Sequence, residues 1–338
     1  YSQKKGEYLV LAEQILVDTI QQCQGDFTCI GFLMGVPGVY ALRSAVLYAQ
    51  GQHESFKNSI DALLNLSEHF TVSEMFNKEL TFGFAGYMAS ILFVMKHVPH
   101  ELFDVKRTKA IVTQCFEYLV DSSTEDILYS FQNRKHFGAS HGLGGVLFVM
   151  LHIPELVWKN EVAIRKGLDC LIRHFDSEGS IPSWYKGDHR IQWCRGTPGV
   201  VPTLLKAYQL FGDVKYLEYA IKGAELTWKK GILRKGLGLC HGISGNAYVF
   251  LQMYEVTKED KYLYQAAQFA SAFTDNRICS IVAGHKDMYR EQVGKPDHLH
   301  SLMEGIPGEG CLYIDLHTPN SSAFPGYWGD LYTFGTPS

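Results

Sequence analysis

The sequence predicts an all-α protein, an α/α toroid whose two concentric helix rings are built from about six to seven helical hairpins. Three observations predict this fold. A Gly-x-x-Gly pattern followed by an apolar run recurs along the chain, amphipathic segments separate these runs, and no sustained apolar–polar alternation indicates strands. A hairpin of one apolar and one amphipathic helix suits an inner and an outer layer.

The glycine loops give the inner helices in order. Their first glycines are 48, 59, 54, 46 and 63 residues apart, which is typical of a repeat architecture. Each following run is apolar on nearly every side, as expected for a buried helix. The six first glycines are Gly35, Gly83, Gly142, Gly196, Gly242 and Gly305.

The segments between the loops predict the outer helices. Residues 54–70, 213–231 and 258–274 place apolar residues on one stripe and charged residues elsewhere. Residues 5–23 form a similar helix, but the inner partner expected before residue 31 is absent. No linker interrupts the pattern, so we expect residues 1–338 to form a single domain.

Composition and charge exclude several classes of protein. The 338 residues carry a formal net charge of -4 with no block of like charges, which argues against nucleic acid as a partner. The apolar runs, such as 145–151, are shorter than the ~18 residues of a membrane-spanning helix. Eight cysteines without a compact framework, and no visible signal peptide, favour reduced thiols and a cytoplasmic location. Peripheral membrane association stays open.

The two residues before each first glycine occupy one slot of the repeat. The six pairs are Leu33-Met34, Thr81-Phe82, Ser140-His141, Cys194-Arg195, Cys240-His241 and Met303-Glu304. Successive repeats are neighbours in a toroid, so Cys194, Cys240 and His241 are expected to converge at the mouth of the ring. The adjacent residues Cys240 and His241 are expected in an irregular loop, where neighbouring side chains can turn toward one ion.

Two thiolates and one imidazole suit Zn²⁺, and three protein ligands leave the fourth position open, as in catalytic sites. A lone cysteine is usually a small buried apolar residue, and a lone histidine before glycine can simply cap a turn. The matching slots of adjacent repeats favour a metal over these explanations. His141, from the preceding repeat, is expected to act as an acid/base or as a fourth ligand.

From about residue 20 to its end, the sequence resembles the LanC-like family, the eukaryotic relatives of bacterial lantibiotic cyclases. The resemblance is carried by ASHGLGG (139–145), QWCRGTPGV (192–200), KGLGLCHGISGNAY (235–248) and SLMEGIPG (301–308). It implies an α/α toroid with zinc bound by Cys194, Cys240 and His241. It also implies thioether formation: bacterial members add a peptide cysteine to dehydroalanine or dehydrobutyrine, and eukaryotic members bind glutathione as a transferase substrate.

The resemblance also assigns roles to single residues. It implies that His141 is the acid/base, that Arg190 is catalytic, and that Lys235 handles the glutathione thiol. The chemistry of the side chains agrees, because a permanently charged arginine suits an enolate oxygen and a histidine can deliver a proton near pH 7. For Arg190 and Lys235, an ordinary surface ion pair or solvated cation remains an equal alternative.

The sequence departs from the family in three places. We find six glycine loops where the family has seven, and Arg195 stands where members usually carry His or Tyr. The acidic residue that bacterial cyclases use in the second loop has no match in 78–86, where Glu79 is nearest.

Other functions compete with a thioether-forming enzyme. A zinc- and glutathione-binding sensor or adaptor without turnover would need the same metal ligands. A zinc prenyltransferase would use a carboxylate ligand, and a glycosidase needs two carboxylates, whereas only Glu304 occupies a mouth slot.

Overall fold

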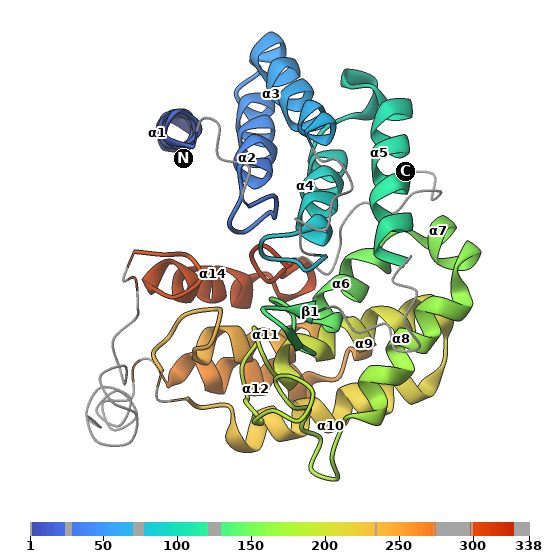
Figure 1. Cartoon of the computed structure of the whole chain (residues 1–338). Helices are drawn as coiled ribbons and strands as arrows, with labels where there is room; N and C mark the ends of the chain where they lie inside the picture. The colour runs from blue at the N-terminus through green and yellow to red at the C-terminus, as the bar shows by residue number, and fades with distance from the viewer. Residues whose placement is uncertain are drawn as a thin grey trace. The chain divides into compact units, whose positions relative to one another are not determined.

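The computed structural model describes residues 2–23, 29–69, 78–120, 130–233, 235–272, 274, 298 and 300–327, which form helices, loops and one short hairpin of strands (Figure 1). Each of the six glycine loops begins a helix, as the sequence predicts, and the first glycine is its N-cap. These helices are α2 (Val36–Ala49), α4 (Phe84–His97), α6 (Leu143–Met150), α9 (Thr197–Phe211), α11 (Ile243–Thr257) and α14 (Ile306–His317).

The remaining described helices lie before the first glycine loop or between two loops. They are α1 (Ser2–Gln22), α3 (His53–Asn65), α5 (Val105–Val120), α7 (Pro154–Lys159), α8 (Glu161–Arg173), α10 (Val214–Lys230) and α12 (Asp260–Ser271). Three short 3₁₀ helices accompany them: η1 (Leu66–Glu68), η2 (His100–Leu102) and η3 (Pro319–Ser321). The outer helices expected at 54–70, 213–231 and 258–274 correspond to α3 with η1, to α10 and to α12.

One feature was not predicted. Strands β1 (Ser130–Phe131) and β2 (Arg134–Lys135) pair antiparallel. Gln132 and Asn133 between them have φ angles of 50° and 60°, which is the left-handed conformation of a tight two-residue hairpin turn. Strands of two residues are too short for a period-two pattern to be seen in the sequence.

Burial confirms an inner and an outer type of helix for α11 and α10, whereas α14 follows a glycine loop but exposes Ile306 and Ile314. Every residue of α11 from Ile243 to Met253 is buried, whereas α10 buries one stripe that includes Tyr216, Ala220 and Ala224. Helix α10 packs against α9, and α12 packs against α11 (Figure 1). The apolar helices also contact one another, since α9 touches both α6 and α11, and α11 touches α14. Apolar faces on all sides are therefore explained by neighbours on all sides.

The contacts divide the chain into two compact units. The first comprises residues 1–129, 152–163 and 331–338, and the second comprises 130–151 and 164–330. In the first unit α2 packs against α1, α3 and α4, and its two glycine loops are joined by a hydrogen bond from the Ile30 amide to the Phe82 carbonyl (2.9 Å). A single domain over 1–338 stays a prediction. No described helix has the length and hydropathy needed to cross a bilayer.

The second glycine of each loop is required by close packing. A Cβ atom on Gly145, Gly199 or Gly245 would overlap the carbonyl oxygen six residues earlier, of Ala139, Trp193 and Leu239 respectively. The first turn of each inner helix thus rests on the backbone of its own loop. This contact explains why Gly-x-x-Gly recurs, and it fixes the loop relative to the helix that follows.

We expect Gly245→Ala to lower the free energy of unfolding by about 1–3 kcal/mol, the usual cost of inserting atoms where none fit. The matched control is Gly310→Ala on α14, where a Cβ meets nothing within 4 Å. That change should leave stability equal or raise it by up to ~1 kcal/mol, because alanine is the better helix former. Chemical denaturation measures both, and equal losses in the two variants would contradict the packing argument.

Aromatic side chains fill the core of the second unit below its loops. The Trp193 ring stacks on Phe324 with centroids 4.8 Å apart, and Tyr327 stacks on Phe148 at 3.8 Å. The Tyr327 hydroxyl donates to the Gly199 carbonyl (3.2 Å). The chain after α14 thereby returns to the inner helices and supports the loop that carries Cys194.

Candidate functional site

The glycine loops of the second unit are held side by side by their backbones. The Ser140 amide donates to the Cys194 carbonyl (3.1 Å), the Cys194 amide to the Cys240 carbonyl (3.1 Å), and the Cys240 amide to the Met303 carbonyl (2.7 Å). Each bond joins one slot of the repeat to a slot of the next repeat. Side chains at equivalent positions of four successive loops are therefore brought to one place.

Cys194, Cys240 and His241 form a cluster that can hold a metal ion. Their ligand atoms all lie within 4.8 Å of one another. In a tetrahedral zinc site, with Zn–S of ~2.3 Å and Zn–N of ~2.0 Å, such atoms lie roughly 3.5–3.8 Å apart. Small side-chain rotations therefore suffice to close the cluster on an ion. The donor set of two sulfurs and one nitrogen fits Zn²⁺ and leaves one coordination position to a substrate.

The two thiols of the cluster have pKa values shifted in opposite directions. A hydrogen bond with Cys240 lowers the pKa of Cys194 well below its usual range, with the charges of His241 and Arg195 acting in the same direction against burial. The same bond raises the pKa of Cys240, and burial and the Glu304 charge add to that rise. Both thiols lie just before the N-terminal ends of α9 and α11, where the helix dipoles favour a thiolate.

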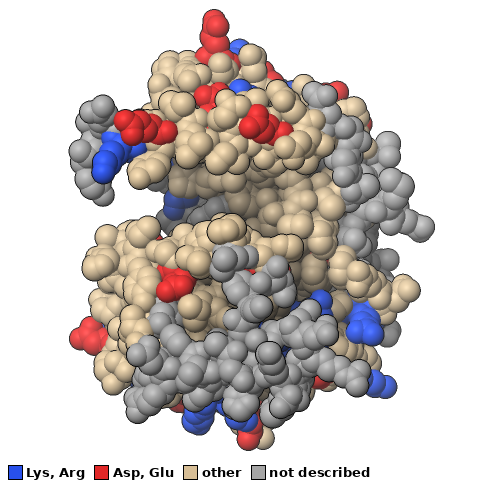
Figure 2. Space-filling model, turned by 90° about the vertical axis from the view of Figure 1, so that its left-hand side faces the viewer, with Lys and Arg blue, Asp and Glu red and all other residues tan. Residues whose placement is uncertain are grey.

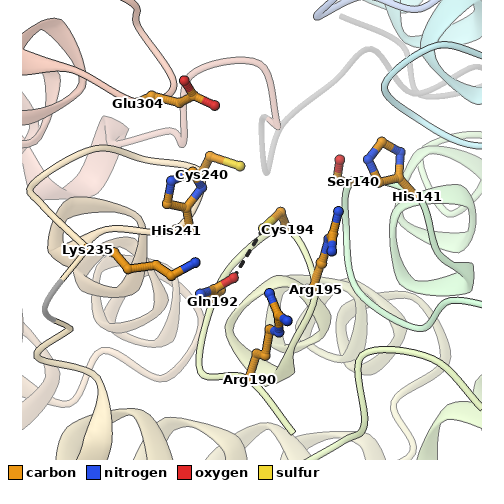
Figure 3. A pocket seen from close by; sticks show the side chains of 10 residues that line it. All are labelled: Ser140, His141, Arg190, Gln192, Cys194, Arg195, Lys235, Cys240, His241 and Glu304. Carbon is orange, nitrogen blue, oxygen red and sulfur yellow. Dashed lines mark hydrogen bonds between the residues drawn. The ribbon is translucent and has the colours of Figure 1, made fainter. Parts of the chain in front are cut away.

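The cluster lies in the wall of a cavity of about 340 Å³, a size typical of small-molecule sites (Figure 3). All six residues that the sequence singled out line this cavity, although their roles stay predictions. Every lining residue is polar or ionisable: Ser140, His141, Arg190, Gln192, Cys194, Arg195, Lys235, Cys240, His241 and Glu304. Figure 3 shows Glu304 on one side, beyond Cys240, and Lys235, Arg190 and Arg195 on the other.

Arg190 is held by a carboxylate behind it. Its Nε donates to Asp188 Oδ2 at 2.6 Å. Burial works to raise the pKa of Asp188, but the hydrogen bond and the charge of Arg190 outweigh it and keep that pKa below its usual value. The ion pair therefore persists at neutral pH and orients the guanidinium, whose remaining N–H groups are available to the cavity.

His141 lies across the cavity from His241 (Figure 3). The Phe131 ring on β1 stacks on its imidazole, with centroids 4.2 Å apart and an interplanar angle of 4°. The neighbouring His136 is a different kind of group, because burial and then the charges of His141 and Arg195 lower its pKa to about 4. His136 is therefore neutral at pH 7 and is not a proton donor to the cavity.

Several residues of the site were missed by sequence reasoning. Gln192 is buried and accepts a hydrogen bond from the Cys194 thiol at 3.6 Å. Asn246 donates to the carbonyls of Ile191 and Gly231, both at 2.9 Å, and so fastens the Cys194 loop to α11. No spacing rule signals these two residues or Asp188 and Phe131, since each acts through a contact that only the folded chain creates.

Two glutamates near the glycine loops have different surroundings. Glu79 uses its carboxylate within its own loop, accepting from the amides of Thr81 (2.8 Å) and Phe82 (2.6 Å). That bonding explains a carboxylate at 1% exposure without a catalytic role. Glu304 instead lines the cavity, and its Oε2 is buried with no hydrogen-bond partner among the described residues.

Charged side chains of both signs lie on the described surface. On the face drawn in Figure 2, the described lysine and arginine side chains are few and scattered, with acidic groups among them.

The sequence is similar to known proteins. A family model described as lanthionine synthetase C-like protein matches residues 1–328. Glutathione S-transferase LANCL1 of Danio rerio is 29% identical over 313 residues, covering 88% of this chain and 73% of that protein. LanC-like protein GCL1 of Arabidopsis thaliana is 29% identical over 314 residues, covering 88% and 70%.

A solved structure shows the fold. Nisin cyclase matches with a TM-score of 0.52 at 15% sequence identity, covering 92% of this chain and 94% of that one. This likeness, with the helical hairpins described above, confirms the predicted all-α class and the α/α toroid.

Proposed function

Because this chain belongs to the lanthionine synthetase C-like family, we propose that it is a zinc-dependent enzyme that forms thioethers. The thiol of glutathione, or of a cysteine, adds to dehydroalanine or dehydrobutyrine in a peptide or protein. The observation that carries the proposal is the cluster of Cys194, Cys240 and His241 in a cavity that also holds His141 and Arg190. The name of one relative, glutathione S-transferase LANCL1, and the name of the structural match, nisin cyclase, support this reaction class.

The addition is balanced without an oxidant or a leaving group. The sulfur–Cβ bond forms, the Cα–Cβ double bond becomes single, and its electron pair moves to the carbonyl oxygen as an enolate. Cα then takes one proton, which replaces the proton that the thiol lost. Zn²⁺, when bound, supplies a Lewis acid that lowers the pKa of a coordinated thiol.

The chain's own residues supply the remaining needs of this reaction. Arg190, oriented by Asp188, donates hydrogen bonds to the developing enolate oxygen, where a preorganised cation acts most strongly. His141 delivers the proton to Cα from across the cavity, with its ring held by Phe131. Lys235 pairs with a negative group of glutathione, since it lines the same cavity.

The proposal places the reaction in the cytoplasm, because glutathione and free thiols belong to reducing compartments. It is supported by the seven cysteines of the described part of the chain, none of which is in a disulfide. These include Cys194 and Cys240, which metal binding requires as thiolates.

The test is a mass measurement. Zinc-loaded protein, glutathione and a dehydrobutyrine-containing peptide should yield a product heavier by one glutathione, faster than without protein. The control is the same protein after zinc removal by a chelator. If glutathione binds to the zinc-loaded protein but no dehydroamino-acid peptide gains its mass, the protein is a sensor or adaptor. Arg195 in the slot after Cys194 is the feature that favours this second candidate.

We expect Arg190→Gln to slow adduct formation about 10²-fold or more, the usual cost of losing a donor to an oxyanion, while glutathione affinity changes little. The donor acts mainly in the transition state, so kcat falls and KM does not. The matched control is Arg165→Gln, which removes an arginine 3.8 Å from Asp213 on the outer helices. Equal rates for the Arg190 variant and the wild type would remove Arg190 from the reaction.

A further inference from the structure

We infer that Arg195 and Glu304 select the thiol substrate by charge, Arg195 pairing with a carboxylate and Glu304 with an ammonium group. The inference rests on the proposed function and names the substrate class of its cavity. That class is a thiol with a carboxylate on one arm and an ammonium group on the other. In glutathione these groups are the glycyl carboxylate and the γ-glutamyl ammonium.

The two residues flank the place where a substrate sulfur would lie. Arg195 directly follows Cys194 in the chain, and Glu304 follows Met303, whose carbonyl accepts from the Cys240 amide at 2.7 Å. Gly238 packs so tightly against the Glu304 backbone that a Cβ there would overlap it. The backbones that carry both side chains are thus held close to the metal cluster. A thiol anchored by its sulfur must direct its two arms past them.

Arg195 differs from Arg190 in that no described carboxylate is paired with it. The Arg190 guanidinium is already paired with Asp188 at 2.6 Å. Arg195 makes no ion pair with a carboxylate within the described residues, although it lines the cavity beside the metal cluster. Its planar, permanently charged head can bind a carboxylate with two parallel hydrogen bonds.

Glu304 lacks a donor that a ligand would provide. Its Oε2 is buried and has no hydrogen-bond partner in the part of the chain that the structure describes. A buried carboxylate oxygen without a donor is costly, and an ammonium group supplies both donor and charge. Figure 3 shows Glu304 on the opposite side of the cavity from Arg190, Arg195 and Lys235, so a ligand of mixed charge can satisfy both sides.

The experiment measures binding, not turnover. Calorimetry compares zinc-loaded wild type, Arg195→Gln and Glu304→Gln with three thiols: glutathione, its glycyl ethyl ester and its N-acetyl derivative. We expect each variant to bind glutathione about tenfold more weakly, the usual effect of losing a hydrogen bond between charged groups. The Arg195→Gln variant should bind the ester as tightly as it binds glutathione, because the carboxylate that Arg195 would pair with is already blocked. The Glu304→Gln variant should likewise bind the N-acetyl compound as tightly as glutathione. Arg195→Gln should still bind the N-acetyl compound more weakly than glutathione, and Glu304→Gln should still bind the ester more weakly than glutathione.

Controls separate charge selection from damage. Zinc content and the affinity for 2-mercaptoethanol, which carries neither charge, should be the same in all three proteins. If the variants bind 2-mercaptoethanol more weakly too, Arg195 and Glu304 support the metal cluster and the inference is wrong. If glutathione binds wild type and both variants alike, the inference fails while the proposed function stands. If glutathione does not bind to wild type, both fail.

Discussion

Replacing Cys194 or Cys240 with alanine is expected to empty the metal site and to abolish thioether formation. Both sulfurs belong to the cluster whose ligand atoms lie within 4.8 Å of one another, and removal of either leaves one thiolate and one imidazole. Zinc affinity should fall by more than the roughly 10–100-fold cost of disturbing an outer-shell partner, because a first ligand is lost. Elemental analysis should change from one zinc per chain to nearly none.

The matched control is Cys170→Ala. Cys170 is as buried as Cys194 and belongs to the same compact unit, but it lies on α8 outside the cluster. This variant should keep its zinc and its activity. Full zinc occupancy in both cluster variants would show that the metal site has been misassigned, whereas zinc loss in all three would point to general unfolding, which circular dichroism detects.

The helices of this fold could be predicted because their signals are local and repeated. Each glycine loop is followed by a helix, and a Cβ clash such as that of Gly245 with the Leu239 carbonyl explains why the glycines cannot vary. The repeat also predicts that the residues before each first glycine lie close together in space. The backbone hydrogen bond from the Cys194 amide to the Cys240 carbonyl is how the structure brings two of these positions together. Repetition thus carried information about tertiary neighbours as well as about helices.

The supporting residues of the site could not be predicted for the opposite reason. Phe131 reaches His141 from a two-residue strand, and Asn246 joins carbonyls 55 and 15 residues away. Such contacts depend on a single folded geometry and leave no period in the sequence. Glu304 is intermediate, since the slot pattern placed it at the mouth, but its buried Oε2 became evident only in the structure.

His141→Asn is expected to keep the zinc and the glutathione affinity and to slow adduct formation by about 10²–10⁴-fold, the usual contribution of a general acid or base. His141 lines the cavity but is not part of the cluster of ligand atoms, so the metal should not depend on it. His136 cannot replace it, because burial lowers the pKa of that imidazole to about 4 and leaves it neutral at pH 7.

The matched control for this variant is His189→Asn, since that imidazole is half exposed, bonds to Ser180 and lies outside the cavity lining. Zinc content, calorimetric binding and adduct mass should be followed in parallel. Zinc loss in His141→Asn would make His141 a fourth ligand, because its removal would then act on the metal and not on the proton. Unchanged turnover with bound zinc would mean that Cα takes its proton from water. The expected pattern, binding intact and turnover lost, arises only if the imidazole acts after the thiol has bound, which is the order of events that the addition requires.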